Sequence, residues 1–164
     1  MQRILDATEF NQKLIRIAHQ IIEEIHDEKL VFFGGITGNG FEMAKSLTDI
    51  VRQFTKQKID LFEIQVNKEE PWNEDITLSI PTSKLKNAYI IIVDDVLNSG
   101  KTMQYTLVEF LKQATKAIKT VAMVDRMHRR YPIKADFVGL CLSTTLQERV
   151  EVFKKKEAFE AFLV

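Results

Sequence analysis

The chain of 164 residues fits one domain, and its 45% hydrophobic and 28% charged residues are typical of a globular protein with a buried core. Its 23 basic and 23 acidic residues balance, so no global field draws it onto nucleic acid or a membrane surface. The single cysteine, Cys141, excludes an internal disulfide and fits the reducing cytoplasm in which we expect the protein to act, and no apolar run is long enough to cross a bilayer.

An amphipathic helix is predicted near the start of the chain, with Thr8 as its N-cap. Apolar residues then recur at helical spacing and predict one buried face: Phe10, Leu14, Ile17, Ala18, Ile21 and Ile25. His19 and His26 have no second ligand at a metal-binding spacing, so both are interpreted as surface residues. This helix is expected to cover a core.

A short apolar strand, Leu30–Phe33, runs into a glycine-rich loop that opens a second helix. Four of the seven residues from Gly34 to Gly40 are glycine, which permits unusual backbone geometry and exposes N–H groups to a ligand. No G-x-G-x-x-G spacing occurs, so a dinucleotide fingerprint is excluded, whereas a simple tight turn remains open. The helix is expected to turn these residues inward: Ala44, Leu47, Ile50, Val51 and Phe54.

The middle of the chain predicts two strands around a polar segment. Ile59–Val66 is expected to be a strand and Ile76–Ile80 a returning one. The segment between them, Asn67–Asp75, contains Pro71 and Trp72. Trp72 is interpreted either as a lid residue or as packing that holds the loop on the domain, and we favour packing.

The stretch YIIIVDDVLNSGKT carries the strongest signal in the chain. Its apolar part, Tyr89–Val93, predicts a strand buried on both faces that ends in two acids, Asp94 and Asp95. A polar loop follows: Asn98, Ser99, Gly100, Lys101 and Thr102. Helical spacing then resumes at Leu107, Val108, Leu111 and Ala114.

This strand–loop–helix turn suits a sugar phosphate. Free N–H groups and the dipole at the helix start favour an anion, Gly100 allows close approach, and Ser99 and Thr102 add hydroxyl donors. The carboxylates would repel a phosphate, so we expect them to bind hydroxyls or a divalent cation. A nucleotide P-loop is excluded, because that pattern needs a glycine where the chain has Asp95.

A further apolar strand is predicted at Ile118–Val124, followed by the polar residues Asp125, Arg126, Met127 and His128. The basic turn beyond it, with Arg129 and Arg130, is open to a purely solvated interpretation. The remaining expectations are a short strand at Ala135–Leu140, an edge strand at Gln147–Phe153, a solvated Lys154–Lys156 and a short helix or tail at Ala158–Val164.

Strands and helices alternate, so the chain is predicted to be an α/β protein with a mostly parallel twisted sheet flanked by helices. The loops that follow parallel strands open at the same edge of the sheet. We therefore expect the glycine loop and the acid-containing loop to face one cleft.

The sequence VDDVLNSGKT resembles the phosphoribosyl diphosphate (PRPP) signature of type I phosphoribosyltransferases. The resemblance implies that residues 1–164 form one domain of that fold, with a small flexible hood at about 65–80. It makes Asp94 and Asp95 the catalytic acids that bind the ribose hydroxyls and, through them or water, Mg²⁺. The implied 5′-phosphate ligands are Asn98, Ser99, Gly100, Lys101 and Thr102; the diphosphate ligands are Gly35, Ile36, Thr37, Gly38, Asn39 and Gly40; and the base ligands are Asp125, Arg126, Met127 and His128.

The stretch VDRMHRRYPIKADFVG is similar to V-D-R-G-H-R-E-L-P-I-R-A-D-Y-V-G of the pyrimidine-operon attenuator/uracil phosphoribosyltransferase branch. The same branch has G-I-K-T-R-G in its diphosphate loop, where this chain has Thr37 and Asn39 in place of the two basic residues. In 6-oxopurine enzymes an aspartate that accepts a proton stands where this chain has Asn98, whose amide cannot take that part.

The resemblance implies a Mg²⁺-dependent enzyme that transfers ribose 5-phosphate from PRPP to a nucleobase, with a uracil-like base favoured, and that forms a homodimer. One alternative is a nucleotide-sensing regulator of pyrimidine genes that binds RNA through Arg126–Lys134. Another is a purine-salvage phosphoribosyltransferase. The expected ligands are PRPP and either a nucleobase or a nucleoside monophosphate, and no membrane partner is expected.

Overall fold

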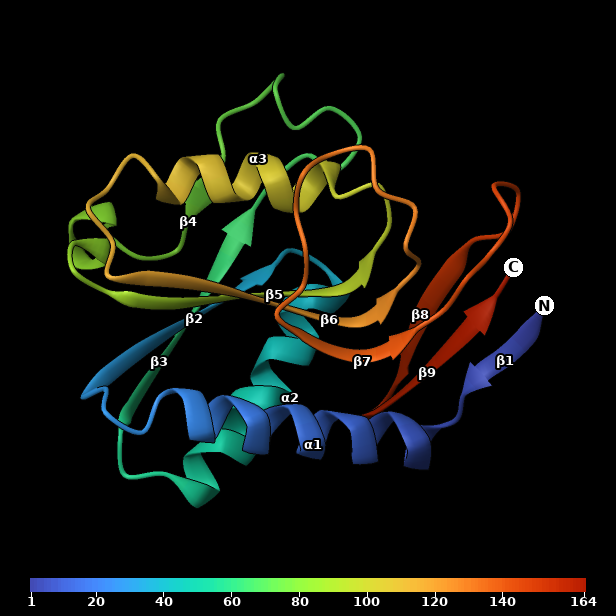
Figure 1. Cartoon of the computed structure of the whole chain (residues 1–164), viewed down its shortest axis with the longest axis horizontal. Helices are drawn as coiled ribbons and strands as arrows, with labels where there is room; N and C mark the ends of the chain where they lie inside the picture. The colour runs from blue at the N-terminus through green and yellow to red at the C-terminus, as the bar shows by residue number, and fades with distance from the viewer.

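A twisted six-stranded sheet lies between two layers of helix, with a small second sheet at one end (Figure 1). The computed structural model describes all residues, Met1–Val164. The elements are β1 (Gln2–Leu5), α1 (Ala7–Glu24), β2 (Leu30–Ile36), α2 (Asn39–Phe54), β3 (Lys58–Gln65), β4 (Thr77–Leu78), a 3-10 turn (Thr82–Leu85), β5 (Tyr89–Leu97), α3 (Lys101–Phe110), β6 (Ala117–Asp125), β7 (Phe137–Cys141), β8 (Val150–Lys155) and β9 (Ala158–Leu163).

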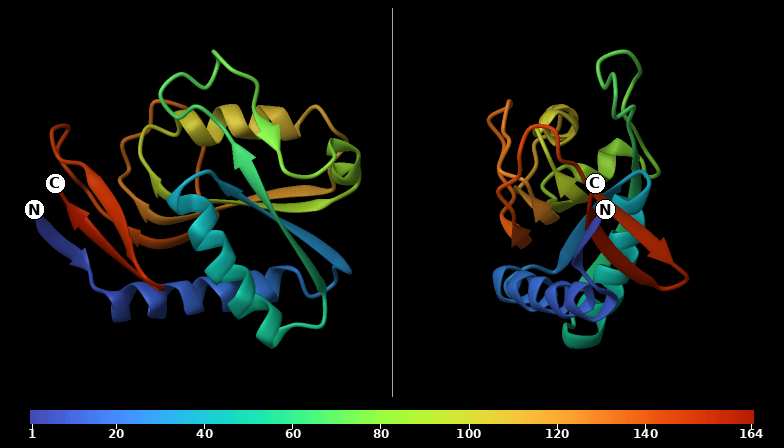
Figure 2. Two further views of the ribbon diagram at one scale, coloured as in Figure 1. Left: turned by 180° about the vertical axis from the view of Figure 1, so that it is seen from behind. Right: turned by 90° about the vertical axis from the view of Figure 1, so that its right-hand side faces the viewer.

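The main sheet has the strand order β4-β3-β2-β5-β6-β7, and only β4 runs antiparallel to its neighbour. Helices α1 and α2 cover one face and α3 covers the other (Figure 2). Side chains of β5 alternate between the two cores, so Ile91 and Val93 pack with α1 and α2 whereas Ile90 and Ile92 pack on the α3 side. The predicted α/β class and the doubly buried central strand are confirmed.

The first helix begins two residues earlier than a Thr8 cap would place it. Its N-cap is Asp6, whose carboxylate accepts from the Glu9 backbone N–H at 2.8 Å while the Glu9 carboxylate accepts from the Asp6 N–H at 2.9 Å. The Thr8 prediction is therefore wrong, because a reciprocal capping box satisfies two backbone donors and a lone threonine satisfies one. The predicted inward face of this helix is confirmed by complete or near-complete burial.

The C-terminal segment is a strand, not the helix or tail that was predicted. Strands β8 and β9 form an antiparallel hairpin that turns at Lys156, where φ is 56°, and β1 pairs with the outer side of β9. Alternation explains the strand, because Phe159 and Ala161 are buried while Ala158 is exposed and Glu160 is partly exposed. Both chain termini therefore lie beside this small sheet (Figures 1 and 2).

Two smaller expectations also change. Phe54 was predicted to face inward but is 56% exposed, where its ring lies 4.8 Å from that of His19. The returning strand predicted at Ile76–Ile80 is only Thr77–Leu78, paired with the end of β3.

No helix has both the length and the apolar character needed to span a membrane.

Candidate active site

A cavity of about 510 Å³ opens where β5 ends and α3 begins. The acid pair and the whole polar loop line it, from Asp94 to Met103. Three other parts of the chain complete the wall: Asn39 at the start of α2, Lys68 and Glu69 from the segment after β3, and Val150–Val152 from β8. The predicted acids and the predicted phosphate loop therefore share one cavity.

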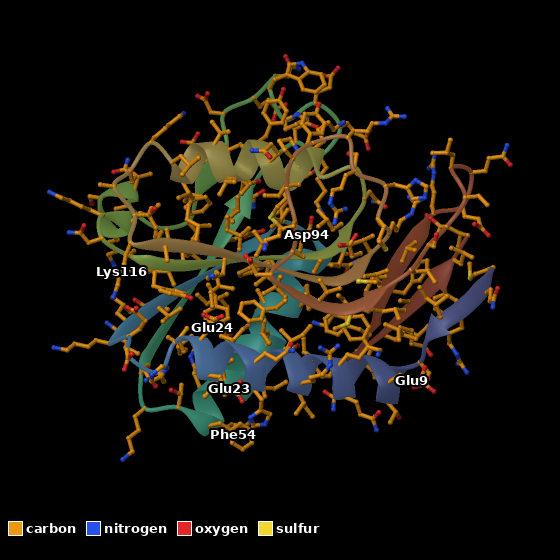
Figure 3. The ribbon with its side chains drawn as sticks, in the orientation of Figure 1. Glu9, Glu23, Glu24, Phe54, Asp94 and Lys116 are labelled. Carbon is orange, nitrogen blue, oxygen red and sulfur yellow. The ribbon has the colours of Figure 1, made fainter.

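Asp94 is nearly buried, with 5% of its surface exposed. Figure 3 shows it inside the molecule, well away from the acidic side chains of α1. Its Oδ1 accepts from the Asp95 backbone N–H at 2.9 Å and faces the Lys68 ammonium at 3.3 Å. Asp95 in turn accepts from the Val96 N–H at 2.9 Å. The two carboxylates are thus held by the backbone of β5 itself.

The buried position changes the acidity of this pair. Burial, reinforced by the charge of Asp95, raises the pKa of the Asp94 carboxyl to about 7, although the Lys68 ammonium opposes the shift. Burial lowers the pKa of Lys68, but the charges of Asp94 and Asp95 outweigh it and the net pKa is raised. Such perturbed groups in a cavity are typical of functional sites.

Gly40, at the start of α2, lies directly against the acid pair. A Cβ at this position would sit 2.9 Å from Asp94 Oδ1 and 3.1 Å from the Val93 carbonyl oxygen. Only glycine therefore allows the second glycine loop to approach the end of β5 this closely. This contact joins the two loops that the sequence placed at one sheet edge.

We expect Gly40→Ala to destabilise the fold by about 1–2 kcal/mol and to weaken the binding of a ligand in this cavity about ten-fold, because the methyl group must displace α2 or the Asp94 carboxylate. Helix propensity alone would favour alanine, so the exposed Gln53→Ala on the same helix is the matched control. Thermal unfolding and calorimetry measure the two effects. An alanine variant as stable as the control, with unchanged affinity, would contradict the close approach.

The phosphate loop leaves a helix start without a side-chain cap. Gly100 is the N-cap of α3, with φ 85°, and as a glycine it has no side chain to cap the helix as Asp6 caps α1. Within the loop, the Ser99 hydroxyl accepts from the Lys101 N–H at 3.2 Å. Helix α2, which starts after Gly38, also lacks a side-chain cap. Both helices whose N-termini lie near the acid pair are therefore available for an anion.

The predicted diphosphate residues are only partly brought to the cavity. Gly35 and Ile36 are buried at the end of β2, and the Thr37 hydroxyl donates to the Glu63 carboxylate at 3.2 Å. Asn39 lines the cavity, but its amide nitrogen donates to the Val152 carbonyl of β8 at 2.7 Å. Neither polar side chain that replaces a basic residue is free, so the backbone would supply the diphosphate donors.

The predicted base residues do not line the cavity, and Arg126 is engaged elsewhere. Arg126 as a whole is 8% exposed, and its guanidinium donates to Asn98 Oδ1 at 2.8 Å, to the Thr144 hydroxyl at 3.1 Å and to the Thr145 carbonyl at 3.3 Å. It also donates to the Glu148 carbonyl. Arg126 therefore joins the phosphate loop to the segment before β8.

The other three base residues lie around this arginine. Asp125 Oδ1 accepts from the Met127 N–H at 2.8 Å and its second oxygen pairs with Arg129. His128 hydrogen-bonds to the Thr144 carbonyl. Met127 is 65% exposed, with φ 60°, and is the one side chain of the four without such a partner. Hydrogen bonds and an ion pair therefore hold this loop beside Asn98.

Magnesium fits the acid pair only in company with a ligand. No cluster of three His, Cys, Asp or Glu side chains able to hold a metal ion occurs in the structure. Mg²⁺ is commonly bound by one or two carboxylates together with substrate oxygens and water. Asp94 and Asp95 supply that number of carboxylates, so a cation carried in with a sugar diphosphate suits this donor set.

Two parts of the cavity wall were not predicted as site residues. Lys68 and Glu69 follow β3, a parallel strand whose carboxyl end opens at the site edge, and that position was a usable signal. Val150–Val152 belong to the separate antiparallel sheet, for which the sequence offered no placement.

A family model described as a phosphoribosyl transferase domain matches residues 1–158. Among curated relatives, the protein named Bifunctional protein PyrR from Streptomyces coelicolor is 31% identical over 160 residues, which cover 91% of this chain and 81% of the relative. The protein of the same name from Corynebacterium glutamicum is 32% identical over 161 residues, which cover 91% and 83%.

Solved structures share the fold at low sequence identity. The hypoxanthine phosphoribosyltransferase of Trypanosoma cruzi matches with a TM-score of 0.79 and 15% identity, covering 98% of this chain and 95% of that one. A hypoxanthine-guanine phosphoribosyltransferase from Bacillus anthracis matches with a TM-score of 0.76 and 16% identity, covering 100% and 98%. At these identities the likeness concerns the fold alone.

Proposed function

Because the chain belongs to the type I phosphoribosyltransferase family, we propose that it transfers ribose 5-phosphate from PRPP to a nucleobase, with a uracil-like base favoured, and releases diphosphate. The observation that carries the proposal is the single cavity lined by Asp94, Asp95 and the uncapped loop at the start of α3. One half of that cavity suits ribose hydroxyls and the other suits a phosphate.

In the proposed reaction, backbone donors of Ser99–Thr102 bind the 5′-phosphate and the helix dipole stabilises its charge. Asp94 and Asp95 accept from the ribose hydroxyls and fix the sugar against the phosphate loop. Their negative charge favours the positive charge that develops on the ribose as its bond to diphosphate breaks. Mg²⁺, when bound, would neutralise the leaving diphosphate. The segment after β3 would exclude water from the reacting carbon.

The contact between Asn98 and Arg126 supports a base other than a 6-oxopurine. Arginine has no acceptor, so the Asn98 amide oxygen must face it and the amide nitrogen must point away. Asn98 therefore offers N–H donors to its surroundings and cannot accept a proton. This supports the uracil-like base over the purine-salvage alternative.

Turnover of PRPP with a panel of bases in the presence of Mg²⁺ tests the proposal. We expect activity with uracil above that with hypoxanthine, and calorimetry should show that ribose 5-phosphate binds to the wild-type protein and not to Asp94→Asn/Asp95→Asn. Turnover only with hypoxanthine would favour the purine alternative. Absence of binding to any ribose phosphate would overturn the proposal altogether.

We also propose that the protein is cytoplasmic and forms a homodimer. Sedimentation tests the dimer.

The engaged side chains of Thr37 and Asn39 favour a second candidate, a catalytically weak regulator that senses nucleotides and binds RNA. The basic surface proposed for RNA binding, Arg126–Lys134, carries less free positive charge than the sequence suggests. Arg126 and Arg129 already donate hydrogen bonds to groups of the protein. Pulldown with pyrimidine-leader RNA at rising salt separates the candidates, because phosphate contacts make binding fall steeply with salt. A flat response would remove the RNA role.

A further inference from the structure

One wall of the candidate active site belongs to the small sheet and not to the main one. The acid pair lies on β5 of the six-stranded sheet, whereas Val150–Val152 lie on β8, which pairs with β9 at one end of the molecule (Figure 1). No strand of the main sheet pairs with β8, so strand pairing does not fix this wall relative to the acid pair. Contacts made by side chains must do so.

Strand β8 has one edge that its own sheet does not use. Arg149 and Val164, which flank the two strands, exchange two backbone hydrogen bonds, both at 2.8 Å. Backbone bonds alternate along an antiparallel pair, so Glu151 also faces β9 while the polar backbone groups of Val152 face the opposite edge. The Val152 carbonyl accepts there from the Asn39 amide nitrogen at 2.7 Å. Asn39 therefore pairs a carbonyl that β9 does not reach.

A second contact joins the same two elements. Glu42, one turn after Asn39 on α2, forms an ion pair with Lys154, two residues after Val152 on β8. These spacings place both contacts on the facing sides of the helix and the strand. Hydrogen bonds from Lys154 and from Lys45, the latter at 2.6 Å, lower the pKa of the Glu42 carboxyl. Lys154 was predicted to be solvated, but its side chain is only 25% exposed. The Asn39–Val152 and Glu42–Lys154 contacts are called the clamp below.

The clamp ties the wall to the acid pair through the start of α2. Asn39 lines the cavity, and the next residue, Gly40, lies directly against the Asp94 carboxylate. The start of α2 is thus fixed relative to Asp94, and β8 is fixed relative to the start of α2. A ribose phosphate uses the phosphate loop and the acid pair, whereas a larger ligand also reaches the wall. The clamp therefore matters most for the part of a ligand that extends beyond the ribose.

We propose that Asn39 is a positioning residue, which holds β8 at the distance from the acid pair that a nucleoside monophosphate needs, with support from the Glu42–Lys154 pair. The inference rests on the proposed function of the cavity and adds a residue that acts through β8 without touching the reacting atoms. The Asn39 amide nitrogen donates to the protein, so its removal takes no donor from a bound ligand. The Asn39 backbone N–H, at the start of α2, is kept when alanine replaces the side chain.

The Asn39→Ala variant tests this role. Calorimetry with ribose 5-phosphate and with uridine 5′-monophosphate compares a ligand that ends at the ribose with one that reaches the wall. We expect the variant to bind the nucleotide roughly five-fold more weakly, because the hydrogen bond that places the wall is lost, and to bind ribose 5-phosphate within about two-fold of wild type. The KM for uracil should rise with little change in kcat. The exposed Asn11→Ala on α1 is the matched control, since it makes the same change in a helix and should alter neither affinity.

The Lys154→Gln variant tests the second contact of the clamp. Because this ion pair is partly exposed, we expect a smaller loss of nucleotide affinity, about two-fold, in the same direction. The neighbouring Lys155→Gln, at a side chain that is 79% exposed, is the control and should bind both ligands as wild type does. Hydrogen exchange over residues 150–155 should be faster in Asn39→Ala and Lys154→Gln than in either control. Circular dichroism shows that all four variants are folded.

The outcomes separate the positioning role from the proposed function. Equal weakening of both ligands by Asn39→Ala would overturn the positioning role and leave the function standing. A lower unfolding temperature with an unchanged ratio of the two affinities would do the same, because Asn39 would then be a purely structural residue. If neither ligand binds to the wild-type protein, the proposed function fails and the positioning role fails with it.

Discussion

Asp94→Asn is expected to make the protein more stable by about 1–3 kcal/mol at pH 8 while lowering kcat/KM by at least about 100-fold. The Asp94 carboxylate is buried beside Asp95, and its pKa is raised to about 7. The charged carboxylate therefore lowers the free energy of unfolding. An amide of the same shape removes that cost. Lys68 loses its partner but keeps contact with water, since its side chain is 39% exposed.

The pH dependence gives this prediction a sign. The pKa of Asp94 is about 7 in the folded chain against an ordinary 3.8, so the folded state binds the proton more tightly. The stability that protonated Asp94 contributes is complete below about pH 4 and is lost as the pH rises through 7. The stability gap between Asp94→Asn and wild type should therefore widen from pH 4 to pH 8.

Chemical denaturation at several pH values measures the gap, and Asp49→Asn, on the exposed side of α2, is the control. A gap that stays constant with pH, or a variant less stable than wild type at pH 8, would contradict the assigned burial penalty. A variant that is more stable and fully active would show that Asp94 is not used in catalysis.

Arg126→Lys is expected to destabilise the protein by about 2–4 kcal/mol, although the charge is kept. The guanidinium serves four acceptors spread over Asn98 and the Thr144–Glu148 segment. An ammonium carries its three donors on one atom and cannot span them, so part-buried hydrogen bonds to the Thr145 and Glu148 carbonyls are lost. The segment before β8 should then loosen, and Asn98 should lose its fixed orientation.

Thermal unfolding and hydrogen exchange over residues 144–148 measure these effects, with the exposed Arg130→Lys as the control in the same loop. We expect faster exchange only in Arg126→Lys. In the base-panel assay KM should rise more than kcat falls, because a misoriented Asn98 affects binding of the base first. Equal behaviour of the two arginine variants would contradict a positioning role for Arg126.

Elements with regular apolar patterns were predictable from the sequence. The inward face of α1, the doubly buried β5 and the two loop–helix junctions follow from spacing within about 20 residues of chain. The errors lie where the signal was short or came from another part of the chain. The prediction of Thr8 as N-cap was wrong because Asp6 and Glu9 form a capping box within one turn. The prediction for the last segment was wrong because β9 forms by pairing with β1 and β8, which lie elsewhere in the chain or beyond a turn.

The site residues likewise fall into a group that the sequence predicts and a group that depends on distant segments of the chain. Asp94, Asp95 and the loop to Thr102 are adjacent in sequence, so one strand–loop–helix turn brings them together and the motif alone could predict their cavity. The loop predicted to bind the base, Asp125–His128, had an equally specific motif. The Arg126 side chain nevertheless donates to Thr144 and Thr145 in the segment before β8. These acceptors lie about 20 residues further along the chain, and no sequence pattern near Arg126 predicts them.

By itself the sequence determined the family, the parallel sheet and the acid–phosphate turn, because each depends on residues that are neighbours along the chain. Only the tertiary structure decided that Lys68 pairs with Asp94, that Gly40 touches the same carboxylate and that Val152 closes the wall. Those contacts join segments separated by dozens of residues. Their geometry is set by how the helices and the two sheets pack, and composition and periodicity do not encode it.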